Sequence, residues 1–285
     1  MTTTAFNTAG STTWTCPAGI TKVDVVVVGG AGSGGCGGQY VGGGGHVASA
    51  NTQAKVTVNP GTTYNLTVGA GGPTNSTFGT SGTAGSASIL YIGTITSAGG
   101  TAGNGGNDNN TGAQNGETGP GSGVGGTGAD GGAGASGGSC QYPYAGGAAG
   151  TGGASGGGGG GGNISWGCAV GNGGAGGHGY ITISYTAASA AFSGTPLSGD
   201  KPLSVQFTGP ASQTTYAWDY GDGGTVDSTT QSPAHTYTTA AKRTVILATT
   251  NAFGFASETK VDYITVLFKA RMYSAMMQSD GLRKT

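Results

Sequence analysis

The stretch Val23–Gly35, VDVVVVGGAGSGG, joins two patterns that predict different structures. Its first half is a run of valines after an alternating start, which is typical of a core β-strand. Its second half, Gly30–Gly35, has the G-x-G-x-x-G spacing of a turn that binds a dinucleotide. The residues that follow decide between a nucleotide site and another fold.

A dinucleotide site requires a helix directly after the glycines, because the helix N-terminus holds the pyrophosphate. Residues 36–45 contain six glycines instead, and each glycine destabilises a helix by about 1 kcal/mol relative to alanine. The acidic residue that should follow about 20 positions later is also missing, since the first acid after Asp24 is Asp108. We therefore expect no nucleotide here, and no cofactor.

The composition excludes several classes of protein. Glycine makes up 66 of the 285 residues, and charged residues only 7%, unlike the charged tails that stay disordered. The net charge of -1 provides no electrostatic attraction to nucleic acid or to an anionic membrane. No segment approaches the ~18 unbroken apolar residues of a membrane span, and the first residues show no secretory signal. We expect neither nucleic-acid binding nor membrane insertion.

The N-terminal part of the chain has the pattern of β-structure interrupted by glycine. Lys22–Val28 is the expected core strand. Lys55–Val58 and Thr63–Val68 flank the turn signature Asn59-Pro-Gly61, which predicts a hairpin or meander. Further strands are expected at Ser88–Ile92 and Tyr180–Tyr185, the second of which should close the domain against the first sheet.

Glycine fills nearly half of residues 99–179 and recurs there at every third position. This period is that of the polyproline-II helix, and rods made of glycine can approach until backbone N–H, C=O and Cα–H groups bond between them. Collagen is excluded because the region has only two prolines. We predict a polyglycine-II bundle, with a flexible linker as the alternative. The periodic runs are Gly125–Gly137, Gly147–Gly162 and Gly171–Gly177.

Several short pieces carry a resemblance to a known family. They are Trp14-x-x-Pro17-x-Gly19, Val27-Val28-Gly29-Gly30, Pro60-Gly61-Thr-Thr-Tyr64-x-Leu-x-Val68-Gly69-Ala70-Gly71-Gly72 and Gly176-Gly-His-Gly179-Tyr-Ile-Thr-Ile. With these pieces, residues 3–186 resemble the glycine-rich domain of bacteriophage tail-fibre adhesins and related virion proteins. The resemblance implies β-structure that carries a polyglycine-II bundle, whose connecting loops touch the host surface.

Residues 187–267 have an ordinary composition and two further motifs, Trp218-Asp-Tyr-Gly-Asp-Gly223 and His235-Thr-Tyr237. This segment resembles a PKD domain, which implies an immunoglobulin-like β-sandwich. Its short alternating strands agree with a sandwich. Trp218 is expected in the core, Asp219 and Asp222 in the turn that follows it, and His235 and Tyr237 in structural positions. The predicted fold class is therefore all-β: a glycine-rich domain at 1–186, then the sandwich.

The segment 268–285 differs from both parts. It holds three of the four methionines, and Phe268, Met272 and Met276 are spaced by four residues, as on one apolar face of a helix. Methionine suits adaptable contact surfaces, so these three residues are candidates for docking to a neighbouring subunit. The alternative is a frayed tail.

No residue pattern predicts catalysis or a metal site. The two G-x-S-x-G matches, at 134–138 and 153–157, lack the strand and helix that a nucleophile elbow requires. The three histidines are dispersed and the four cysteines form no C-x-x-C pair. Asp219 and Asp222 are better explained by a turn. The chain is therefore expected not to be an enzyme.

Aromatic residues occur in the segments that join the glycine runs. Tyr142, Tyr144 and Trp166 lie in these segments, and aromatic rings on loops can stack on sugar or protein. We take these three residues as candidates for host contact. The alternative is that the rings cap the bundle.

These observations favour a non-enzymatic structural or adhesion protein at the virion surface, either a tail fibre or a capsid decoration protein. Its expected partners are other virion proteins, further copies of the chain (a trimer being usual for fibres), and a host glycan or protein. The missing signal pattern agrees with synthesis in the host cytoplasm. A bacterial cell-surface adhesin is the alternative, and a polysaccharide hydrolase with an accessory PKD module is less favoured.

Overall fold

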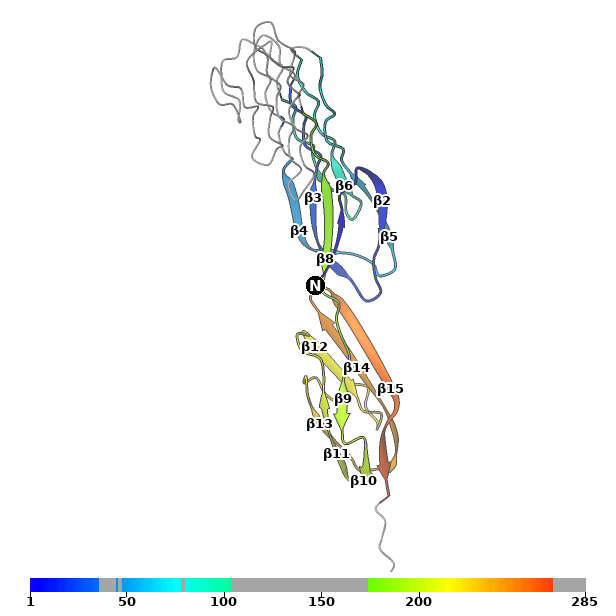
Figure 1. Ribbon diagram of the computed structural model, residues 1–285. Helices are drawn as coiled ribbons and strands as arrows, with labels where there is room; N and C mark the ends of the chain where they lie inside the picture. The colour runs from blue at the N-terminus through cyan, green and yellow to red at the C-terminus, as the bar shows by residue number, and fades with distance from the viewer. Residues whose placement is uncertain (36–44, 46–47, 78–79, 104–173, 269–285) are drawn as a thin grey trace, which may run out of the picture. The chain divides into compact units, whose positions relative to one another are not determined.

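The computed structural model describes residues 1–35, 45, 48–77, 80–103 and 174–268. The chain divides into two compact units, Met1–Thr186 and Ala187–Thr285. Every regular element among the described residues is a β-strand, so the all-β prediction is confirmed. Figure 1 labels most of these strands.

The first sheet of the N-terminal unit has the strand order β1-β8-β3-β4 and is antiparallel throughout. Its strands are β1 (Thr2–Phe6), β8 (Tyr180–Tyr185), β3 (Lys22–Val28) and β4 (Ala50–Thr57). The bounds predicted for β3 and β8 are confirmed. The predicted closure is confirmed too, because β8 lies between β1 and β3 although more than 100 residues separate it from either in the sequence.

The second sheet has the order β2-β5-β6-β7 and is also antiparallel. Its strands are β2 (Gly10–Thr15), β5 (Thr63–Val68), β6 (Ser88–Leu90) and β7 (Ile95–Ser97). The predicted strand at Ser88–Ile92 is thus present but shorter.

The hairpin predicted around Asn59–Gly61 is wrong. β4 pairs with β3 in the first sheet, whereas β5 pairs with β2 in the second. The turn is present, with Gly61 at a φ of 76°, but it leads the chain from one sheet to the other. A turn signature predicts a reversal of the chain and does not identify the partner of either strand.

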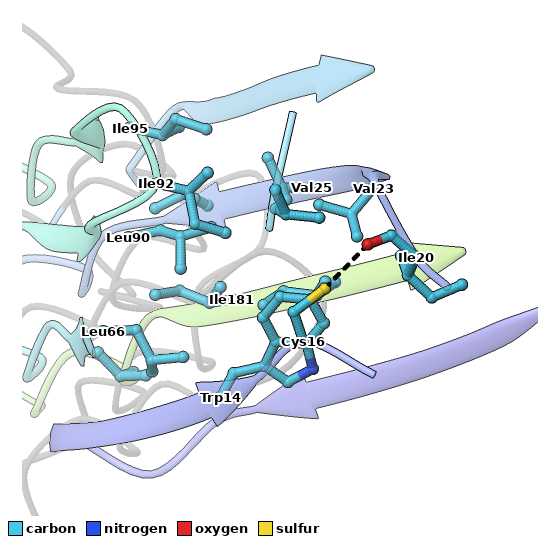
Figure 2. Close-up of a cluster of buried hydrophobic side chains, with 14 residues drawn as sticks. Trp14, Cys16, Ile20, Val23, Val25, Leu66, Leu90, Ile92, Ile95 and Ile181 are labelled. Carbon is cyan, nitrogen blue, oxygen red and sulfur yellow. Dashed lines mark hydrogen bonds between the residues drawn. The ribbon is translucent and has the colours of Figure 1, made fainter. Parts of the chain in front are cut away.

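The two sheets share one hydrophobic core. Alternate side chains of β3 and β8, such as Val25 and Ile181, meet Leu66 and Leu90 of the second sheet, and each of them is almost completely buried. Figure 2 shows these side chains together with Trp14 and Cys16. The alternation places every second residue inside, as expected for strands with one buried face.

Cys16 lies inside this core as a free thiol. Its Sγ–H donates to the carbonyl oxygen of Ile20 at 3.3 Å, as Figure 2 shows. Burial raises the pKa of the Cys16 thiol. The side chain therefore acts as a small apolar group with one satisfied donor.

The C-terminal unit is a sandwich of two sheets with the orders β10-β15-β14-β12 and β13-β11-β9. All its strand pairs are antiparallel except β10 with β15. The strands are β9 (Ser193–Thr195), β10 (Ser198–Asp200), β11 (Leu203–Thr208), β12 (Thr215–Asp219), β13 (Ala234–Tyr237), β14 (Ala241–Asn251) and β15 (Gly254–Leu267).

Aromatic rings fill the centre of this sandwich. Phe207 of β11 stacks on Tyr220 with ring centroids 5.1 Å apart, and Trp218 of β12 meets Phe192 edge-to-face at 5.2 Å. Trp218 is completely buried, so its predicted core position is confirmed. Aromatic pairs in these geometries add about 0.5–1.5 kcal/mol each to the stabilisation from buried area.

Candidate functional site

Five glycine-containing segments of the N-terminal unit continue the strands beyond the sheets. We call them rods: residues 29–34, 69–72, 82–86, 99–103 and 174–179. Rod 29–34 directly follows β3, rod 69–72 follows β5, and rod 174–179 runs directly into β8. The rods from both sheets thus meet in one bundle.

Hydrogen bonds between the rods repeat every third residue. Gly30 and Ser33, three residues apart, donate to Ser86 and Thr83, which are also three residues apart, and the same step recurs in four further rod pairs. This is the period of the polyproline-II helix, so the described rods have the polyglycine-II arrangement. The bonds are Gly30 N to Ser86 O (2.8 Å), Ser33 N to Thr83 O (2.9 Å), Ala31 N to Gly177 O (2.9 Å), Gly34 N to Gly174 O (2.9 Å), Gly100 N to Gly30 O (2.8 Å) and Gly103 N to Ser33 O (2.9 Å).

Rod 29–34 is the centre of this network. It exchanges backbone hydrogen bonds with each of the four other rods, including one in which the Gly72 amide donates to the carbonyl of Ala31 at 2.8 Å. The amides of Gly30, Ala31, Ser33 and Gly34 all donate to carbonyls of the bundle. These belong to the G-x-G-x-x-G match, and a pyrophosphate would need such amides. The residues of the G-x-G-x-x-G match therefore form a rod of the bundle, in which these amides are already hydrogen-bonded.

The contacts between rods explain the glycines. A Cβ added at Gly30 would overlap the carbonyl oxygen of Ala70, and one added at Gly85 would overlap that of Gly30. The obstacle is backbone in both cases, so no side-chain movement can relieve it. The close approach is the reason why glycine is required at these positions.

Two buried serines join the sheets to the bundle. Ser88 Oγ accepts the amide of Gly69 at 2.9 Å and donates to the carbonyl of Val28 at 2.6 Å, which links the ends of β5 and β3. Ser97 Oγ accepts the amide of Gly29 at 3.0 Å. Ser88 is completely buried and Ser97 almost so. Each hydroxyl satisfies a backbone amide at the point where a strand becomes a rod.

The turn after Trp218 is held by carboxylates. Asp219 Oδ1 accepts the amide of Gly221 at 2.8 Å, and Gly221 has a φ of 72° that favours glycine. Asp227 Oδ2 accepts the amide of Tyr220 at 2.7 Å. The predicted turn role of Asp219 is therefore observed.

His235 and Tyr237 complete this structural cluster. His235 Nε2 lies 2.8 Å from Asp222 Oδ2, and its ring stacks on Tyr220 with centroids 4.1 Å apart. Tyr237 donates its hydroxyl to the carbonyl of Tyr220 at 3.2 Å. Burial raises the pKa of Tyr237, and the negative charge of Asp222 adds to the shift. These groups stabilise the turn and are not arranged as a nucleophile and its base.

The structure describes one of the six residues predicted to contact a host or a neighbouring subunit. Tyr142, Tyr144, Trp166, Met272 and Met276 lie outside the described residues. Phe268, the sixth candidate, is described: its side chain is 75% exposed and the Lys201 ammonium lies 5.1 Å from its ring centroid.

Sequence reasoning missed Ser88, Ser97 and Asp227, because a single serine or aspartate in a short polar stretch is not distinctive. The predicted polyglycine-II region, 99–179, includes rods 99–103 and 174–179, whereas its runs Gly125–Gly137 and Gly147–Gly162 lie outside the described residues. Sequence reasoning missed the other three rods, 29–34, 69–72 and 82–86, although a signal was present. Glycines three residues apart flank the strands, as in the pairs Gly69 with Gly72 and Gly176 with Gly179, and each of these four would clash with backbone if it carried a Cβ.

Two further properties concern only the part of the chain that the structure describes. No group of three or more His, Cys, Asp or Glu side chains is placed to hold a metal ion there. No helix in these ranges has the length and apolar character needed to cross a bilayer.

Comparison with known families agrees with this architecture. A glycine-rich domain model matches residues 6–201, and a PKD domain model matches residues 188–266. A search of curated proteins found no match. The second match contains the cluster around Trp218, and the first contains all five rods. Because the first match covers more than half of the chain, this protein belongs to the glycine-rich domain family and carries a PKD domain after it.

Proposed function

We propose that this chain is a non-enzymatic structural protein of a bacteriophage particle surface, either a tail fibre or adhesin or a capsid decoration protein. The observation that carries the proposal is the network of backbone hydrogen bonds among the five rods. Such a network gives order without a large hydrophobic core, and a rigid scaffold suits a protein that presents loops to another surface.

The lack of acidic and basic residues in the five rods supports a contact role with a neutral partner. The five rods contain no Lys, Arg, Asp or Glu, so they offer hydrogen-bonding and van der Waals surface rather than a charged field. Neutral host glycans are recognised through hydrogen bonds and aromatic stacking. Tyr142, Tyr144 and Trp166 are the residues that we propose for this contact.

Attachment to the particle is proposed at the other domain. The Phe268 ring is exposed beside Lys201 and precedes Met272 and Met276 in the sequence. Exposed aromatic and methionine side chains suit subunit contacts. The proposed partners of this segment are other virion proteins or further copies of the chain, for example in a trimer.

Immunogold labelling of intact particles tests this proposal. Antibodies raised against residues 187–267 should label particles from a culture that produces the chain, at the tail tips for a fibre or over the capsid for a decoration protein. Antibody absorbed beforehand with the purified chain is the control. Label on the bacterial envelope alone would instead support a cell-surface adhesin.

The enzymatic alternative needs a separate experiment. Purified chain is incubated with host cell envelope, and soluble glycan is measured against a sample without protein. We expect no release above that background. Release that depends on the chain would overturn the non-enzymatic assignment.

A further inference from the structure

One contact between two rods uses a side chain in place of a backbone carbonyl. The amide of Gly71 donates to Nδ1 of His178 at 3.1 Å. On either side of it the same rods are joined by ordinary backbone bonds, from Gly176 to the carbonyl of Gly72 at 2.8 Å and from Gly179 to that of Gly69 at 2.9 Å. His178 thus takes the middle position of a three-bond contact.

This bond depends on the protonation state of the imidazole. Nδ1 can accept a hydrogen bond only while it carries no proton, so the neutral ring must hold its proton on Nε2. When Nδ1 takes up a proton from water, both ring nitrogens become donors. The bond from Gly71 is then lost, and a positive charge lies against an N–H dipole. His178 is exposed, so water has access to the ring.

The ionisable groups near the rods indicate that acid would affect the bundle through His178. It is the only ionisable side chain in the five rods, and Gly71 belongs to a rod without one. Among the tyrosines of the adjoining strands, burial raises the pKa of the Tyr180 hydroxyl. The ionisable side chains of β3, β4, β5 and β8 are Lys22, Asp24, Lys55, Tyr64, Tyr180 and Tyr185, of which Asp24 and Lys55 are paired with each other.

We propose that His178 is a pH-sensitive latch at the base of the glycine bundle, closed when its ring is neutral and open when it is protonated. Rod 69–72 leaves β5 of the second sheet and rod 174–179 enters β8 of the first. The latch therefore controls how firmly the rods of the two sheets are joined where they enter the bundle. This inference does not depend on the proposed virion role.

The closed latch has a direct signature in NMR spectra of the full chain labelled with ¹⁵N. A coupling through the hydrogen bond should connect the Gly71 amide nitrogen with Nδ1 of His178 at a pH of about 7.5, and should disappear on acidification to a pH of about 5. Absence of the coupling at both pH values would overturn the proposal.

Amide exchange measures the consequence. The protection factor of the Gly71 amide, corrected for the intrinsic pH dependence of exchange, should fall about two- to tenfold over the same interval, the range expected for one hydrogen bond. The Ala31 amide, which donates to Gly177, is the internal control and should keep its protection. A fall at Gly71 no larger than that at Ala31 would contradict the latch.

The variant His178→Gln provides a matched control, because it keeps a polar side chain that does not ionise. The exposed position makes this substitution compatible with folding. In the variant, protection of Gly71 should no longer depend on pH. The same pH-dependent loss in His178→Gln would show that another group is responsible, and would overturn the proposal.

Discussion

Ser88 Oγ accepts the amide of Gly69 at 2.9 Å in the interior of the N-terminal unit, and the same hydroxyl donates to Val28. Replacing Ser88 with alanine removes both bonds and takes away the hydroxyl that accepts the buried Gly69 amide. We expect Ser88→Ala to lower the free energy of unfolding by about 2 kcal/mol, within the usual penalty for unsatisfied buried groups. Urea denaturation followed by circular dichroism measures the change.

The matched control for this prediction is Ser11→Ala. Ser11 is exposed, and its hydroxyl contacts that of Thr67 at 3.1 Å on the surface. Its replacement should change the free energy of unfolding by less than about 0.5 kcal/mol, as surface substitutions do. Equal losses in both variants would show that the Ser88 link does not stabilise the junction.

Gly30→Ala tests the close approach of the rods. The added Cβ would overlap the carbonyl of Ala70, so the rods must separate and lose hydrogen bonds. We expect Gly30→Ala to lower the free energy of unfolding by about 3 kcal/mol, which is the upper end of the usual destabilisation by overpacking. Gly61→Ala is the control, because its Cβ meets no atom within 4 Å but its φ is 76°; backbone strain alone should then cost about 1–2 kcal/mol. Thermal denaturation measures the stability of both variants. A smaller loss of stability in Gly30→Ala than in Gly61→Ala would contradict the close packing of the rods at Gly30.

The sequence predicted those parts of the fold that depend on local patterns. The valine run in Lys22–Val28 and the alternation in Tyr180–Tyr185 specified both strands with their bounds, because such patterns arise locally from side chains that face fixed sides of a strand. The motif around Trp218 likewise indicated a core residue followed by a turn. These features need no knowledge of which distant segment is the partner.

Features that depend on distant partners could not be predicted. The turn at Asn59–Gly61 is evident in the sequence, but the pairing of β4 with β3 and of β5 with β2 depends on packing between sheets. The serine links have no periodic signal at all, since a buried serine and an exposed one look alike in the sequence. The role of His178 also depends on a contact with Gly71, which is 107 residues away.

Alkaline unfolding should reveal the buried tyrosines of the C-terminal sandwich. Burial raises the pKa of Tyr237, and the charge of Asp222 adds to the shift; burial also raises the pKa of Tyr220. A raised pKa in the folded state gives stability that is complete below the unfolded value of about 10 and is lost as the pH rises above it. Chemical denaturation between pH values of about 8 and 12 should therefore show decreasing stability.

The variant Tyr237→Phe identifies the group responsible for this alkaline loss. It removes the ionisable hydroxyl together with its bond to Tyr220, so it should be less stable at neutral pH by about 1 kcal/mol but lose less stability at alkaline pH. The exposed residue Tyr91 provides the control Tyr91→Phe, which should follow the unmodified chain. An unchanged alkaline slope in Tyr237→Phe would refute the assignment.

Acid should weaken the pair formed by Asp24 and Lys55. Burial acts to raise the pKa of Asp24, but hydrogen bonds from the Lys55 amide and ammonium, with the ammonium charge, lower it overall. A lowered pKa gives stability that is present above the unfolded value of about 3.9 and is lost as the pH falls through the folded value. Asp24→Asn should be less stable by under about 1 kcal/mol at neutral pH, since the pair is partly exposed. The difference should vanish in acid, and its persistence there in denaturation curves would contradict the ion pair.

The proposed host contact can be separated from folding by substitution. Replacing Tyr142, Tyr144 and Trp166 together with alanine should reduce binding of the labelled chain to host cells at least tenfold, because each aromatic side chain at the centre of an interface can contribute about 1–3 kcal/mol. Tyr91→Ala, at an exposed tyrosine in the turn after β6, is the control and should bind normally. Circular dichroism establishes that both variants are folded. Full binding by the folded triple variant would exclude these rings as the contact and would leave the bundle surface as the site to test.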